Sequence, residues 1–524
     1  NFSLNKKEEK KEENIKKKAM IEKVIGCALI GLDGQKVDVE VNVLRGAKFL
    51  MVGLPDNAVK ESHYRIAAAL KNIGYKIPIK EIIINLAPAD LKKEGSAYDL
   101  PIALGILSAS EQIISKKLKE FMIMGELSLD GEIRPIKGVL SMALKAREMG
   151  LKGIVIPYDN LLEASLVKGI DIIGAKNLSD IINHFCNNDP ISYQYKINHK
   201  KKKLKSNLDF RDVMGQQIAK RAVEIAASGG HNLLMIGPPG SGKSMIAKRI
   251  PTILPDLIES QMLETTKIYS FLGKYDKNKG LINQPPFRDP HHTISDVALV
   301  GGGPHPKPGE ISLAHNGVLF LDELPEFKRK VLEVLRQPLE NREITISRSM
   351  GTVTFPSNVM LVAAMNPTPD GDYFNLHNSK NSYHKVQQYL SKLSQPLLDR
   401  IDLQIEVDSV SIEQLSNSNL KEESSCKIKK RVQTARDIQI KRQGKTNSEL
   451  NPSEIKLYCS LNEDSLKLLK KATLKLNLSA RTYTRIQKIA RTIADLASAT
   501  NIEVDHIAEA IQYRSLEKMK AFLN

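Results

Sequence analysis

Residues 233–244 read Leu-Leu-Met-Ile-Gly-Pro-Pro-Gly-Ser-Gly-Lys-Ser, and this stretch decides the predicted fold. Four apolar residues suggest a strand, and the next eight fit G-x-x-x-x-G-K-[ST] ahead of a helix that Pro251 should end. Such a loop wraps phosphates with backbone N–H groups, while its Lys reaches the β- and γ-phosphates and its Ser holds Mg²⁺. The sequence therefore predicts an α/β fold that binds ATP and Mg²⁺ through Gly237, Pro238, Pro239, Gly240, Ser241, Gly242, Lys243 and Ser244.

A second apolar strand, residues 318–321, ends in the carboxylates Asp322 and Glu323. Continuous apolar runs of this kind are typical of buried parallel strands. Asp322 is predicted to lie beside the bound Mg²⁺, and Glu323 to orient and activate the attacking water. A carboxylate in that second position distinguishes an ATP hydrolase from a protein that only holds the nucleotide.

A third apolar strand, residues 359–365, ends in Asn366. Hydrolysis also needs a polar side chain between the second carboxylate and the γ-phosphate, and Asn366 is the candidate. An Asn before a proline, here Pro367, is more often a turn residue. The prediction therefore depends on the order of the surrounding motifs.

The chain is expected to contain three folded parts. Residues 1–19 form a charged extension, with Met20 as an alternative start, and residues 20–185 form a mixed α/β domain in which alternating valines at 37–43 mark a strand. A lysine-rich linker at 186–208 leads into the nucleotide-binding core at 209–410. The remaining residues, 411–524, form a small all-helical domain with a helix capped by Ser479.

The charge of the chain suggests a polyanionic partner. Lys and Arg outnumber Asp and Glu by 77 to 60, for a formal charge of +17, which favours nucleic acid. Biased composition is the alternative, because many lysines fall in the runs at 6–18 and 200–205. The 4 cysteines are scattered, and no apolar run approaches the roughly 18 residues of a membrane helix. We expect a cytoplasmic protein that does not enter a membrane.

The order of these motifs resembles that of the AAA+ superfamily. Three longer strings resemble the magnesium-chelatase-like ComM (YifB) family, and the resemblance covers about residues 20–515. They are Phe287-Arg288-Asp289-Pro290-His291-His292-Thr293-Ile294-Ser295, Pro308-Gly309-Glu310-Ile311-Ser312-Leu313-Ala314-His315-Asn316-Gly317 and Gln395-Pro396-Leu397-Leu398-Asp399-Arg400. The resemblance implies a homohexameric ATPase ring with an AAA+ core containing a parallel sheet and a helical lid.

By that resemblance Arg400 is the arginine finger that enters the neighbouring subunit's site, and Arg481 is the second sensor from the lid. Either arginine taken alone would be read as part of a surface salt bridge. Rings of this family place hairpins in the central pore, and residues 344–355 form two alternating runs around a glycine-containing turn. Arg342 and Arg348 are the candidates for contact with DNA phosphates, although a hairpin that only completes the domain fits equally well.

Two features depart from family patterns. Family members often carry a Cys-Pro-Cys-Gly cluster after the Asn-Pro, whereas here Thr368-Pro369-Asp370-Gly371 follows, so no zinc site is predicted. His291 and His292 are adjacent rather than spaced as helical metal ligands, which favours a structural role over metal binding.

Residues 85–150 resemble the Lon protease domain through Lys93-Glu94-Gly95-Ser96-Ala97 and Gly125-Glu126-Leu127-Ser128-Leu129-Asp130-Gly131. Aligned on Lys93 and Gly95, the nucleophilic serine of Lon falls at Ala97. Aligned on Pro135-Ile136 and Gly138, its lysine falls at Leu140. Ser96 lies one residue out of register. We therefore predict a Lon-like fold without peptidase chemistry.

Three functions follow from these patterns. The preferred one is a DNA branch-migration helicase of the ComM type, acting on recombination intermediates during natural transformation. The alternative is a protein-remodelling ATPase with a protein partner, like the magnesium-chelatase motor subunit. The third, a peptidase, is disfavoured by Ala97 and Leu140. The motor chemistry is common to the first two, so the sequence does not separate them.

Overall fold

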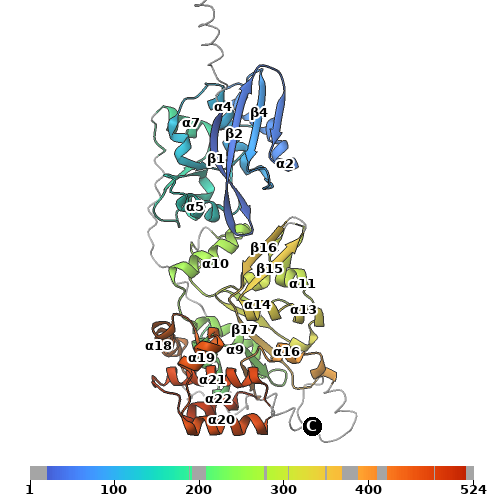
Figure 1. Ribbon diagram of the computed structural model, residues 1–524, viewed down its shortest axis with the longest axis vertical. Helices are drawn as coiled ribbons and strands as arrows, with labels where there is room; N and C mark the ends of the chain where they lie inside the picture. The colour runs from blue at the N-terminus through green and yellow to red at the C-terminus, as the bar shows by residue number, and fades with distance from the viewer. Residues whose placement is uncertain are drawn as a thin grey trace, which may run out of the picture. The chain divides into compact units, whose positions relative to one another are not determined.

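A computed structural model describes residues 21–187, 189–191, 208–276, 280–304, 306–348, 351–368, 388–409, 422–476 and 478–514. The chain forms two compact units (Figure 1). The first comprises residues 1–202 with 266–281, and the second comprises 203–265 with 282–524. The proposed extension at 1–19 and most of the proposed linker lie outside the described residues.

The first unit contains a mixed seven-stranded sheet with the order β3-β4-β2-β1-β5-β8-β9. The predicted valine-rich strand is β2, whose Val37, Val39 and Val41 are fully buried on one face. β1 and β4 flank β2 in antiparallel register, while β5, β8 and β9 add in parallel. The strands are β1 Glu22–Ile30, β2 Asp33–Leu44, β3 Phe49–Val52, β4 Glu81–Ala87, β5 Phe121–Ile123, β8 Gly153–Pro157 and β9 Asp171–Ala175, with a separate hairpin of β6 Glu126–Leu127 and β7 Ile133–Arg134.

Helices cover this sheet. α4 packs on β1 and β2, and α5 packs on β2 and β8. Residues 57–72 form two helices that meet at Glu61, since α2 ends there and α3 begins after it. The helices are α2 Asn57–Lys60, α3 Ser62–Asn72, α4 Asp99–Ala109, α5 Val139–Glu148, α6 Leu161–Ala164 and α7 Leu178–Cys186.

The second unit is built around a five-stranded parallel sheet with the order β11-β14-β17-β10-β18. β10, β14 and β17 are the three apolar strands of the sequence, and all their residues are buried. β17 begins one residue later than predicted. The strands are β10 Leu233–Ile236, β11 Phe287–Arg288, β14 Val318–Leu321, β17 Met360–Met365 and β18 Leu403–Glu406. Because they are parallel, their carboxyl ends meet at one edge.

The carboxyl-terminal helices pack directly on the nucleotide-binding core. α8 contacts both α18 and α21, and apolar residues of all three helices belong to the same hydrophobic core as β10. The Ser479 side chain caps α21 by accepting from the backbone N–H of Thr482, as the sequence predicts. The helices of this part are α8 Gln217–Gly229, α18 Ser425–Gln443, α19 Pro452–Tyr458, α20 Glu463–Lys475, α21 Ala480–Leu496 and α22 Val504–Gln512.

Shorter elements of the second unit surround the strand ends. They are α9 Lys243–Arg249, α11 Asp296–Val300, β12 Gly301–Gly302, β13 Lys307–Pro308, α12 Glu310–Leu313, α13 Arg329–Glu333, α14 Arg336–Asn341, β15 Glu343–Arg348, β16 Gly351–Pro356 and α16 Gln395–Leu398. α10, Glu259–Phe271, begins in the second unit, but residues 266–281 belong to the first. No helix within the described ranges is both long and apolar enough to cross a bilayer.

Asp402, just before β18, ties the core to α21 through a buried cluster of polar groups. Its carboxylate pairs with Arg485 of α21 and lies 3.4 Å from Nδ1 of His231. His231 Nε2 lies 2.8 Å from the hydroxyl of Thr492, also on α21. Burial by itself would raise the pKa of Asp402, but Arg485 and His231 hold it well below its usual range.

We expect Asp402→Ala to lower the free energy of unfolding by about 3–5 kcal/mol, since it leaves a partly buried Arg485 unpaired. The contribution of Asp402 is complete above the unfolded-state pKa of about 4 and is lost as the pH falls below it, because the folded-state pKa is depressed. Urea titrations between pH 3 and 7 measure both effects. Asp256→Ala, at a side chain that is 73% exposed, is the control and should cost no more than about 1 kcal/mol. A loss at Asp402 as small as the control's would contradict the prediction.

Candidate active site

The loop between β10 and α9 has the backbone conformation that phosphate binding requires. Gly240 and Gly242 have φ values of +79° and +88°, in the left-handed region that favours glycine. Gly237 has no room for a side chain, because a Cβ there would lie 2.1 Å from the carbonyl oxygen of Val407. The glycines of the motif are thus demanded by conformation and by packing.

Lys243 places its ammonium group inside this loop. Nζ donates to the carbonyl oxygens of Gly237 and Pro238 at 2.7 and 2.8 Å, and lies 3.4 Å from both Ser241 Oγ and Asn366 Oδ1. Burial lowers the pKa of Lys243, and the negative charge of Asp322 opposes that shift. A buried ammonium held by neutral oxygens provides positive charge where the motif places the β- and γ-phosphates.

Ser244 and Asp322 come together as predicted for a magnesium site. Ser244 Oγ donates to Asp322 Oδ2 at 2.6 Å, although the two residues are 78 positions apart in the chain. A hydroxyl and a carboxylate are oxygen ligands that suit Mg²⁺, which usually keeps several waters and takes substrate phosphates as well. These two residues therefore fit the ion and would hold it, and the ion would neutralise negative charge on the phosphates there.

Asn366 lies next to the loop because of strand register. Ile236 pairs with Met365, so Asn366 follows β17 beside Gly237 and its amide oxygen faces Lys243. Tyr389, which the sequence did not single out, is buried next to the backbone of Asn366, and its environment also includes Glu323. Burial raises the pKa of Tyr389 to about 12, so the phenol is neutral at physiological pH.

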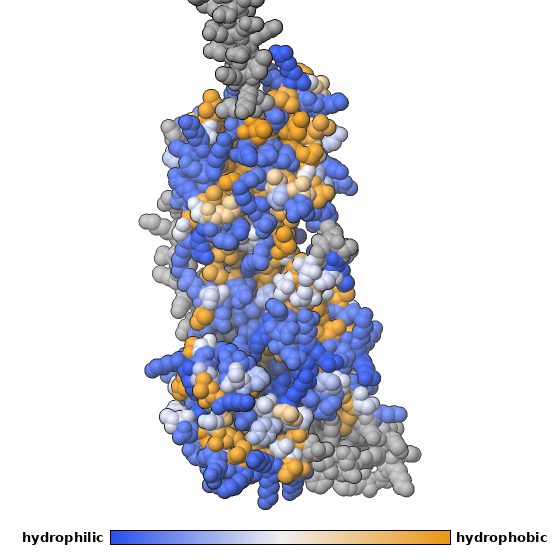
Figure 2. All heavy atoms as spheres, in the orientation of Figure 1, coloured by the Kyte–Doolittle hydropathy of each residue, from blue (hydrophilic) through white to orange (hydrophobic). Residues whose placement is uncertain are grey.

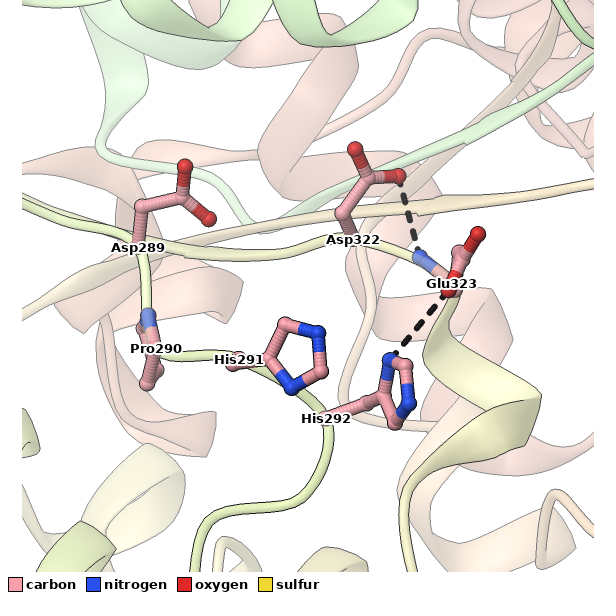
Figure 3. Close-up of a pocket in the computed structure, with 6 residues that line it drawn as sticks. All are labelled: Asp289, Pro290, His291, His292, Asp322 and Glu323. Carbon is pink, nitrogen blue, oxygen red and sulfur yellow. Dashed lines mark hydrogen bonds and ion pairs between the residues drawn. The ribbon is translucent and has the colours of Figure 1, made fainter.

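Glu323 projects from a strained turn into a pocket that the sequence did not anticipate. Its φ is +50°, which is uncommon for a residue with a side chain, and its backbone N–H donates to Asp322 Oδ1 at 3.0 Å. The pocket has a volume of about 280 Å³ (Figure 3) and is lined by Asp289, Pro290, His291, His292, Asp322 and Glu323.

The adjacent histidines thus lie beside the predicted catalytic carboxylates. In Figure 3 the Glu323 side chain points toward His292, whose Nδ1 lies 3.2 Å from Glu323 Oε2. Burial raises the pKa of Asp289, on the other side of the pocket. The sequence favoured a purely structural role for His291 and His292 and did not predict that they lie beside these carboxylates. The preceding strand, β11, is only two residues long, so its strand signal in the sequence was too weak to reveal their position.

The two arginines predicted to act at the nucleotide share a neighbour in their own chain. The guanidinium of Arg400 is paired with Glu340 and donates to the carbonyl oxygen of Pro396 at 2.7 Å. The positive charge of Arg481, in the first turn of α21, also acts on Glu340, whose pKa is lowered chiefly by Arg400. Arg400 is buried and paired, whereas an arginine finger must reach a neighbouring subunit. The predicted finger role would therefore require that Glu340 release it.

The two predicted DNA-contacting arginines differ in their surroundings. β15 and β16 form the predicted hairpin, with the turn residues Ser349 and Met350 outside the described part. Arg348 is exposed at its end. Arg342 lies at its base, where its guanidinium donates to Glu449, Asn358 and Ser448, and burial lowers its pKa. Groups of its own chain therefore hold Arg342 at the base of the hairpin, and its contact with DNA stays a prediction.

The positions of the Lon catalytic pair carry no catalytic side chains. Ala97 lies in a short 3₁₀ turn, and Leu140 is fully buried in α5, where its backbone N–H donates to Glu163. Ser96 donates instead to Glu126. The segment in which family members carry the cysteine cluster lies almost entirely outside the described residues, since 369–387 are not described.

Three family models together match most of the chain. Residues 209–415 match the magnesium chelatase subunit ChlI model, residues 39–160 match the model of subunit ChlI of Mg-chelatase, and residues 422–514 match the ChlI C-terminal model. The first match covers the site-bearing core, the second covers the middle part of the first unit, and the third covers the carboxyl-terminal helices.

Individual relatives extend the likeness. Competence protein ComM of Haemophilus influenzae is 45% identical over 95% of this chain and 98% of its own length. The uncharacterized protein YifB of Escherichia coli is 43% identical over 94% of this chain and 96% of its own. Lon protease 2 of Bacillus subtilis is 30% identical over 25% of this chain and 23% of its own. Together with the site geometry, these matches show that the chain belongs to the ComM/YifB family of magnesium-chelatase-like AAA+ ATPases.

Proposed function

We propose that this chain is the subunit of a homohexameric ATPase ring in the cytoplasm that moves DNA through its centre. Its activity is that of a ComM-type branch-migration helicase in recombination and natural transformation. The similarity to a competence protein over almost the full length supports this choice. The observation that carries it is the β15–β16 hairpin, which presents polar groups suited to a nucleic-acid backbone.

The hairpin has one apolar and one polar face. Ile344, Ile346 and Phe355 are buried, while hydroxyl groups cross-pair on the outer face. Thr345 faces Thr354 at 3.4 Å and Ser347 faces Thr352 at 3.1 Å. Figure 2 shows that hydrophilic residues dominate the nearby surface over α11, α13 and α14. Hydroxyls and an exposed arginine contact phosphates without reading bases, as a motor that must pass any sequence requires.

A protein-remodelling ATPase is the second candidate, because all three matching family models describe subunit ChlI of magnesium chelatase. That function needs the same ATP site but a protein partner. The two candidates are separated by whether branched or single-stranded DNA stimulates ATP hydrolysis. Stimulation by a protein partner, with no salt-sensitive DNA binding in any nucleotide state, would favour remodelling.

We expect Arg348→Ala to weaken DNA binding while sparing basal ATP hydrolysis. The loss of affinity should depend little on the DNA sequence. Backbone contacts release counterions, so affinity for duplex DNA falls by roughly 0.9 log units per phosphate contact for each decade of salt, and losing one contact flattens that slope accordingly. Fluorescence anisotropy across a salt series, with ATP-bound protein, measures the change. Arg211→Ala, which removes the same charge from an exposed site on a different element, is the matched control. Equal salt slopes for the two variants would show that the hairpin is not part of the DNA-binding surface.

A further inference from the structure

The carboxylate assigned to water activation has a neighbour that no motif assigns. His292 Nδ1 lies 3.2 Å from Oε2 of Glu323 across the pocket of Figure 3. The Glu323 side chain is 58% exposed, and that of His292 is 31% exposed. An exposed glutamate samples many rotamers, so holding it in the productive orientation costs conformational entropy. A fixed partner on one oxygen reduces this cost.

His292 is itself held in place. Its ring lies on that of His291, with centroids 4.1 Å apart, and meets Phe327 edge-on at 6.4 Å and 78°. His291 in turn has Nδ1 3.0 Å from the hydroxyl of Thr293. The imidazole is therefore braced on two sides by rings, while the glutamate that it approaches is the more exposed partner.

The arrangement has the geometry of an oriented base. Asp322 engages Ser244 with its own carboxylate, so Glu323 is the carboxylate of this turn that is available to water. Since His292 approaches Oε2, the other oxygen, Oε1, is the one left to accept a proton. A base held by a third group is the arrangement found where a nucleophile must be activated in one orientation.

We propose that His292 is a positioning residue for ATP hydrolysis, whose ring N–H donates to Glu323 and holds the second carboxylate oxygen toward the attacking water. The proposal rests on the hydrolytic role of Glu323. It is independent of DNA, so it is tested in assays that contain none. It predicts an effect on kcat, because the described contacts of His292 are with Glu323, His291 and Phe327 and none is with the phosphate-binding loop.

Three substitutions of His292 distinguish the effect of its N–H donor from the effect of its aromatic ring. His292→Asn keeps an N–H donor near the position of Nδ1 but removes the ring. His292→Phe keeps the packing on His291 and Phe327 but removes the donor, and His292→Ala removes both. We expect Phe and Ala to lower kcat by roughly tenfold or more, while Asn stays within about threefold of the parent, as expected for misplacement of a catalytic group. ATP affinity, followed with a fluorescent ATP analogue, and thermal midpoints should be unchanged in all three.

The reverse order of kcat among these variants would show that His292 has a different role. If Phe is near the parent and Asn is low, the ring has only a packing role and the proposal is overturned. Parent-like kcat in all three variants overturns it as well. In a Glu323→Gln background, His292→Phe should cause no additional loss, because the two residues act as one unit. If Glu323→Gln itself hydrolyses ATP at the parent rate, the catalytic assignment of Glu323 fails, and the proposal fails with it, whatever DNA does.

Discussion

Glu323→Gln is expected to retain ATP and Mg²⁺ but to reduce turnover by about 10²–10⁴-fold, the range of general-base effects. The amide preserves the shape of the side chain and cannot take a proton from water. Ser244, Lys243 and Asp322 form their own contacts without Glu323, so the nucleotide-binding groups stay in place. Steady-state hydrolysis and equilibrium binding of a fluorescent ATP analogue measure the two properties separately.

Lys243→Ala, by contrast, is expected to lose ATP binding itself. It removes the ammonium group that lies near four oxygens in and beside the loop. The two variants must therefore differ in affinity. Near-parental turnover in Glu323→Gln would show that Asp322 and Glu323 have been assigned incorrectly.

Arg400→Ala is expected to leave ATP binding nearly intact and to lower turnover by about a hundredfold or more, the size of arginine-finger effects. The residue is proposed to act in the neighbouring subunit's site. Mixing Arg400→Ala with Lys243→Ala should then restore part of the activity, because some interfaces in mixed rings contain both intact groups. Absence of any recovery under conditions of subunit exchange would argue against action in trans.

Glu340→Ala tests the alternative that Arg400→Ala lowers turnover only because it destabilises its own domain. In the described structure Arg400 is paired with Glu340, whose side chain is 55% exposed. If Arg400 only stabilises its own domain through that pair, Glu340→Ala should lose as much activity as Arg400→Ala. If Arg400 acts on a neighbour's phosphate, Glu340→Ala frees it, and turnover should be at least that of the parent. Thermal midpoints of both variants show whether either fold is damaged.

Prediction from sequence worked best where one short segment carries both the fold and the chemistry. The loop at 237–244 and the strands β10, β14 and β17 follow from apolar runs that end in glycine, carboxylate or amide. Parallel strands of buried residues must align their carboxyl ends, so Ser244, Asp322 and Asn366 were expected to meet, and Ser244 does lie 2.6 Å from Asp322.

Prediction was poorer where a side chain's role depends on a distant partner. Arg342 and Arg348 are equivalent in the sequence, yet one is tied to Glu449 and the other is exposed at the end of the hairpin. Arg485 was not singled out, although it pairs with the buried Asp402. Tyr389 beside Asn366 also left no local signal, because the two residues are joined only through the packing of separate segments.

The sequence by itself determined the nucleotide-binding loop, the two carboxylates after β14, the mixed α/β first unit and its missing Lon pair at Ala97 and Leu140. These follow from local spacing and residue type, because hydrophobic periodicity and glycine conformation act over a few neighbouring residues. Only the tertiary structure decided that His292 faces Glu323, that Glu340 holds Arg400, and that residues 266–281 join the first unit. Contacts of this kind arise when folding brings distant charges and rings within a few ångströms, and no periodicity in the chain encodes which side chain will be there.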